Sequence, residues 1–214
     1  MTSLRAAGYR VLFAILAKPA LLAATVREIE SECGASRQAV SELLVRLRSE
    51  GAVTRTGRSE HRLVPGRRGE LVARFAGGWS DVLAPALTVG RFRGRAEAGV
   101  ANDASIERTL RRLDVTWGFG GTAGAMRLAP HYRGADTVLH VAAWSDELQR
   151  VLGLVPDRAG PVAIYRTMGG LDLATEVAHC AHPLLVHAEL LTSGDDRARE
   201  AARVIRDRFL RDEG

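Results

Sequence analysis

Ten polar side chains between Ser36 and Arg62 have the chemistry that DNA reading requires. Glutamine and arginine present paired hydrogen-bonding groups that match adenine and guanine edges, and serine bonds either to bases or to phosphate. Arginines in a basic segment neutralise backbone phosphates. The candidate DNA-binding residues are Ser36, Arg37, Gln38, Ser41, Glu42, Arg48, Arg55, Arg58, His61 and Arg62.

Two predicted helices would position the first six of these side chains. Thr25 and Glu28 have the spacing of a capping box, which begins a helix. Gly34 is placed to end that helix, and Ser36 to cap the next one. One face of the second helix carries an apolar stripe at helical spacing, made of Val40, Leu43, Leu44 and Leu47. The candidate residues of this helix are expected to point the other way.

A short hairpin would carry the remaining candidates. Gly51 stops the second helix, residues 52–55 and 60–64 read as strands, and residues 56–59 turn between them. Helix, turn, helix and β-ribbon is the order of a winged helix-turn-helix, whose second helix enters a DNA major groove. The alternative is a small helical domain with a solvated polar face, because winged folds also mediate protein contacts.

Charge placement favours DNA over a protein partner. Residues 1–69 hold 12 Lys/Arg and 6 Asp/Glu, net +6, whereas residues 70–214 hold 18 and 19, net −1. The positive excess of the chain therefore lies in the segment that would meet phosphates. We expect a winged helix-turn-helix DNA-binding domain over residues 1–66 and a second domain over residues 67–214.

The apolar runs, the N-terminal residues and the two cysteines indicate the cellular compartment. The longest uncharged apolar run, residues 11–17, has seven residues, and a membrane-spanning helix needs about 20. The first 24 residues lack a clear signal-peptide cleavage pattern. Cys33 and Cys180 fall in different predicted domains without partner spacing. A cytoplasmic protein without a membrane contact is expected.

The second half alternates predicted strands with helices. A helix over residues 67–83 links the domains, and the predicted strands are 88–93, 115–119, 137–143, 161–165 and 174–178. The predicted helices are 104–113, 122–128, one capped by Ser145, 183–191 and 195–210. Together with the winged helix this pattern predicts an α+β protein.

Three stretches of the second half resemble a known family. They read WGFGGTAGAMRLAPHYRGADTVLHV, LGLVPDRAGPVAIYR and HPLLVHAELLTSGDDRAREAARVIRDRFL. In this order, over residues 117–210, they are similar to the C-terminal domain of AbiEi-type antitoxins, transcriptional regulators of type IV toxin–antitoxin and phage-defence systems. The resemblance implies DNA-binding autorepression through the winged helix, and an α/β C-terminal domain that is nucleotidyltransferase-like and ends in helices. Its implied partners are double-stranded operator DNA, with a homodimer and a functional link to a nucleotidyltransferase-type toxin left open.

The nucleotidyltransferase relationship raises an enzyme alternative, a nucleotide-binding or nucleotide-transferring domain fused to a winged helix. Gly120-Gly121-Thr122 at a helix start could present N–H groups to a triphosphate. Such an enzyme also needs two carboxylates on one face of the next strand to hold Mg²⁺. That strand begins at Asp136, and no second carboxylate stands two residues away. We therefore predict a degenerate scaffold, no catalytic residue and no cofactor.

The second half also contains a cluster of possible metal ligands. His179, Cys180, His182 and His187 lie within nine residues and include ligand types that suit zinc. Pro183 breaks the segment at a change of structure, which would scatter the side-chain directions. Ordinary core and surface histidines are the preferred interpretation, and no metal is predicted.

Overall fold

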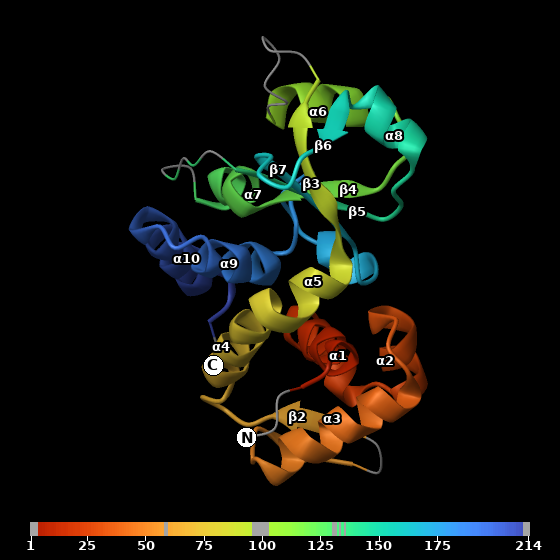
Figure 1. The fold of residues 1–214 in the computed structure, drawn as a ribbon. Helices are drawn as coiled ribbons and strands as arrows, with labels where there is room; N and C mark the ends of the chain where they lie inside the picture. Colours follow the sequence, from red (N-terminus) through yellow and green to blue (C-terminus); the bar gives the residue numbers. More distant parts are fainter. Residues whose placement is uncertain are drawn as a thin grey trace.

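A computed structural model of the protein describes residues 4–57, 60–95, 103–129, 132, 134 and 136–211. Among the candidate DNA-binding residues, Arg58 lies outside these ranges. Figure 1 shows α1, α2, α3 and the small hairpin at one end of the molecule and the larger sheet at the other, with α9 and α10 between them.

The N-terminal elements follow the predicted winged helix-turn-helix order. They are α1 (Ala6–Ala17), a 3₁₀ turn η1 (Pro19–Ala23), α2 (Val26–Cys33), α3 (Arg37–Ser49), β1 (Val53–Arg55) and β2 (His61–Leu63). The strands pair antiparallel, so the hairpin forms the wing of the fold.

A helical segment joins the wing to the larger sheet, but it is not the single regular helix predicted over residues 67–83. Helix α4 (Arg68–Gly78) widens into a π-helical turn, η2 (Trp79–Leu83), and continues as α5 (Ala84–Leu87). Pro85 lies just beyond the wide turn. It has no N–H to donate to the carbonyl four residues earlier, and its ring would crowd that carbonyl. This explains why regular α-helical bonding is interrupted there.

The larger sheet has five strands in the order β4-β5-β7-β3-β6. Their bounds are β3 (Thr88–Gly94), β4 (Trp117–Gly120), β5 (Thr137–Val141), β6 (Leu154–Pro156) and β7 (Val162–Arg166). Strands β5 and β7 are parallel and the other neighbours antiparallel. The helices of this part are α6 (Asp103–Leu110), α7 (Gly121–Leu128), α8 (Asp146–Val151), α9 (Pro183–Thr192) and α10 (Asp196–Phe209). The predicted α+β class is confirmed.

One predicted strand is absent and one observed strand was not predicted. Residues 174–178 follow a 3₁₀ turn, η3 (Gly170–Leu173), and form no strand. Their amides bond locally instead: the N–H of Ala174 donates to the Leu171 carbonyl at 3.2 Å, and that of Val177 to the Thr175 hydroxyl at 3.3 Å. Strand β6 was missed. It is short, ends on Pro156 and lies at the sheet edge, where a proline without an N–H is tolerated.

The core is continuous across the predicted domain boundary. Phe13 of α1 lies 5.6 Å from the Phe75 ring of α4 and 5.5 Å from the His182 ring before α9. Helix α4 fits closely against α1, because a Cβ on Gly78 would come within 2.0 Å of the Tyr9 ring. The boundary at residues 66 and 67 stays a prediction, and the packing means that experiments on DNA binding should use the full chain.

Candidate nucleic-acid interface

The turn before α3 is built as the sequence predicts. Thr25 and Glu28 form the capping box of α2. Gly34 ends that helix in the left-handed region with φ +61°, and the Ser36 hydroxyl accepts from the Ala39 N–H at the start of α3. A Cβ at position 34 would also lie 3.1 Å from the Met168 carbonyl. The turn of the helix-turn-helix therefore packs against the C-terminal part of the chain, at the backbone of Met168.

Helix α3 presents the predicted polar face to solvent. Its four-residue stripe is buried, and Ser36, Arg37, Gln38, Ser41 and Glu42 are exposed, with Arg48 half-buried. Burying the stripe fixes the rotation of the helix about its own axis. The structure therefore brings these six candidates together on one accessible surface.

Three of the exposed candidates on α3, Arg37, Gln38 and Glu42, have partners within the protein. The Arg37 guanidinium pairs with Glu30 of α2 at 2.7 Å, and the Gln38 amide donates to the Glu42 carboxylate at 2.7 Å. Bonding to Glu30 raises the pKa of Arg37 above its ordinary value. Arg37 consequently holds α2 against α3, and Gln38 must exchange its bond to Glu42 before it can bond to a base.

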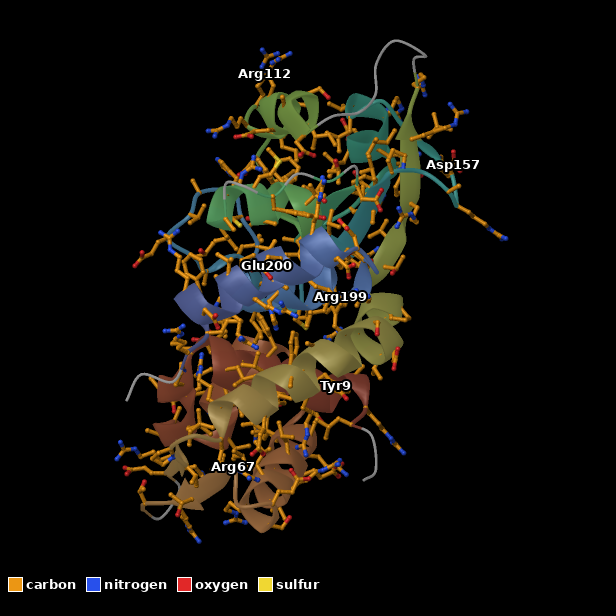
Figure 2. The ribbon with its side chains drawn as sticks, turned by 90° about the vertical axis from the view of Figure 1, so that its left-hand side faces the viewer. Tyr9, Arg67, Arg112, Asp157, Arg199 and Glu200 are labelled. Carbon is orange, nitrogen blue, oxygen red and sulfur yellow. The ribbon has the colours of Figure 1, made fainter. Side chains whose placement is uncertain are left out.

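The wing carries three further candidates, Arg55, His61 and Arg62, beside α3. Arg62 pairs across the hairpin with Thr54, and both are exposed. Arg55 lies opposite His61, and its Nε donates to the Gly57 carbonyl at 2.9 Å. Figure 2 shows Arg67, just after the wing, at the winged-helix end of the molecule and Arg112 at the opposite end.

Sequence reasoning missed an anchor at the end of α3. The Glu50 carboxylate pairs with Arg74 of α4 at 2.6 Å and with Arg46 at 3.0 Å, and its carbonyl accepts from Arg67 at 3.1 Å. Partial burial would raise the pKa of Glu50, but the two guanidinium groups outweigh it and hold that pKa below its ordinary value. These arginines fasten α3 to α4, so part of the positive charge of residues 1–69 is structural.

The glycine turn of the larger sheet is already occupied. The Gly121 N–H donates to Glu189 Oε2 of α9 at 2.6 Å, and the other oxygen of that carboxylate lies 2.6 Å from His140 Nε2. A Cβ on Gly120 would lie 2.3 Å from the same carboxylate. A buried carboxyl group thus stands where the N–H groups would receive a phosphate.

Over its described residues, the strand beside this turn carries one carboxylate, that of Asp136 at its start. Asp136 is exposed and pairs with Arg91 at 3.2 Å. The position two residues later is Val138, which faces Gly120 across the strand pair. An apolar residue and an arginine-bound carboxylate give too little negative charge to hold a divalent cation against phosphates.

His140, beside the glycine turn, and Asp172 of η3 are buried ionisable groups that interact electrostatically. Burial would lower the pKa of His140, but the Glu189 carboxylate outweighs that effect and raises it. Burial raises the pKa of Asp172 to about 6, and its Oδ2 accepts from the Met168 N–H at 2.6 Å. This pairing stabilises the loop that supports the helix-turn-helix.

The four histidine and cysteine side chains of this cluster have separate partners. His179 stacks on Trp117 with 4.3 Å between ring centres, and the Cys180 thiol donates to the Gly124 carbonyl. His182 Nδ1 accepts from the Leu184 N–H, and burial lowers its pKa to about 4. His187 Nδ1 lies 2.9 Å from the Ala202 carbonyl. Over the described ranges, no three His, Cys, Asp or Glu residues converge on a metal position.

In the part of the chain that the structure describes, no helix combines the length and apolar character needed to cross a bilayer.

Comparison with known proteins gives two family matches. Residues 62–211 match the family described as transcriptional regulator, AbiEi antitoxin, type IV TA system, and residues 4–62 match the MarR family. No curated protein and no solved structure gives a significant match. The two matches meet at Arg62 in the wing.

Proposed function

The chain belongs to the family of AbiEi antitoxins, transcriptional regulators of type IV toxin–antitoxin systems, and we propose that it represses its own operon by inserting α3 into the operator major groove. The observation that carries this proposal is the capped helix α3, whose exposed Gln38, Ser41 and Glu42 face away from a buried leucine stripe. The MarR-like segment over residues 4–62 supports a DNA-binding winged helix.

Base reading and phosphate binding are assigned to different elements. Gln38, Ser41 and Glu42 contact base edges, because they lie on the central outward face of α3. Ser36, Arg37 and Arg48 flank that face, and the wing residues Arg55, Arg58, His61 and Arg62 meet the flanking phosphates. Phosphate contacts position the protein, whereas base contacts specify the sequence.

The proposal is tested with the full-length protein and duplexes enriched from a random pool. The logarithm of the affinity is expected to fall linearly with the logarithm of salt concentration, because bound arginines displace counterions. Arg62→Ala should weaken binding to all duplexes and reduce the salt slope by about 1. Gln38→Ala should keep the slope and lose about 1–3 kcal/mol of discrimination between sequences.

The matched control removes the same charge elsewhere. Arg112 is exposed and lies at the end opposite the winged helix (Figure 2), so Arg112→Ala should leave affinity and slope unchanged. Failure to bind any duplex at low salt would remove the DNA-binding proposal. Loss of sequence preference in Arg62→Ala but not in Gln38→Ala would reverse the assignment of groove and backbone contacts.

We also propose that the chain is not an enzyme and transfers no nucleotide. Glu189 at the glycine turn, Arg91 on Asp136 and the apolar Val138 support this. Purified protein incubated with Mg²⁺ or Mn²⁺, labelled nucleoside triphosphates and RNA or protein acceptors should give no labelled product. Labelled product that disappears in Asp136→Ala would establish the enzyme alternative instead.

The remaining partners follow from the regulator role. We propose a cytoplasmic protein whose function is linked to a nucleotidyltransferase-type toxin of the same operon, as the family description of a type IV system supports. A homodimer on a two-fold operator would place its half-sites about 10–10.5 base pairs apart or at a multiple of this distance.

A further inference from the structure

An apolar side chain lies at the centre of the DNA-facing surface. Val45 of α3 is 54% exposed, and among the described residues of the winged helix it is the one large apolar side chain that lies mostly in solvent. At about 100° per residue, Val45 lies about 20° from Gln38 and between Ser41 and Glu42. It is therefore nearly opposite the buried leucine stripe.

Folding gives no reason for valine at this position. The side chain packs into no part of the core, so it contributes little to burial energy. A branched Cβ also restricts side-chain rotation in a helix, which makes valine a poorer helix former than alanine. A ligand contact explains this residue better than stability does.

We propose that the Val45 side chain contacts the C5-methyl group of a thymine in the operator major groove, and so selects T·A at one position. The inference rests on the proposed function, because it requires α3 in that groove. Among the groups that base pairs present in the major groove, the thymine methyl is the apolar one. Its polar neighbours Ser41 and Glu42 are placed to bond to base edges on either side of the contact.

The test removes the thymine methyl group and the valine methyl groups, first separately and then together. Enriched duplexes are remade with deoxyuridine at each thymine in turn, which deletes only the methyl group. One substitution should weaken binding of the unchanged protein about fourfold, the effect of burying one methyl group at about 0.8 kcal/mol and 1.4 kcal/mol per tenfold. In Val45→Ala the same substitution should have no effect.

Two controls separate a lost contact from a damaged protein. Val45→Ala should unfold at the same temperature as the unchanged protein or slightly higher, because alanine favours the helix. Val204→Ala removes an exposed valine from α10, where the original is 44% exposed, and should keep the full sensitivity to deoxyuridine.

The outcomes distinguish this inference from the proposal beneath it. Absence of any duplex binding would remove the function itself. Sequence-selective binding with no sensitive thymine, or with a sensitivity that persists in Val45→Ala, would leave the function standing and overturn the Val45 contact. Enriched duplexes that share no thymine would overturn it as well.

Discussion

Replacing Glu189 by alanine is expected to lower the free energy of unfolding by about 3–5 kcal/mol, the usual cost of removing one partner from a buried ion pair. The carboxylate accepts from the Gly121 N–H and pairs with His140, and all three groups are buried. Its loss leaves a buried donor and a buried imidazole without their partner. Urea unfolding followed by circular dichroism measures the change.

Two further variants show whether the loss of unfolding free energy comes from the buried position of Glu189 or from its charge. Glu200 of α10 is 66% exposed and pairs with Arg203, so Glu200→Ala should cost less than about 0.5 kcal/mol. Glu189→Gln retains an oxygen for the Gly121 N–H but no charge for His140, and should fall between the two alanine variants. Equal stability of Glu189→Ala and Glu200→Ala would refute the structural role of this carboxylate.

The parts of the fold that depend on nearby residues could be predicted from the sequence. The capping box at Thr25, the left-handed turn at Gly34 and the serine cap of α3 were all predicted, because each depends on contacts within a few residues. The same holds for the outward polar face, since helical spacing alone orients it once the leucine stripe is buried.

Contacts between distant residues could not be predicted in this way. Glu189 reaches Gly121 across 68 residues, and no local pattern links them. The glycine turn therefore suggested an open phosphate site that the fold has filled from α9. The prediction of a strand over residues 174–178 was wrong because local turns use the amides of this segment.

In the candidate interface, too, the set of residues could be predicted from the sequence but their contacts could not. Its residues were predicted as a set, but the sequence did not reveal that Arg37 is tied to Glu30 or that Gln38 is tied to Glu42. It also did not separate the arginines that fasten α3 through Glu50 from those of the wing. Charge counts locate a basic surface, whereas individual roles depend on which carboxylates lie nearby.

Asp172→Asn is expected to stabilise the protein in a pH-dependent manner. Asp172 is 1% exposed, one of its oxygens has no hydrogen-bond partner, and burial raises its pKa from 3.8 to about 6. The folded state therefore prefers the protonated acid. Its stabilising contribution is fully present below about pH 4 and is lost as the pH rises through about 6. Asparagine stays neutral throughout.

Relative to the unchanged protein, the unfolding free energy of Asp172→Asn should therefore rise by about 2–3 kcal/mol between pH 4 and pH 8, at about 1.4 kcal/mol for each pKa unit. His140, the ionisable neighbour whose pKa is also raised, remains in the variant, so its own titration largely cancels in the difference. Urea unfolding of both proteins across this range measures it. A difference that stays constant with pH would mean that Asp172 does not titrate between these limits, and that the Met168 loop supports the helix-turn-helix without a buried ionisation.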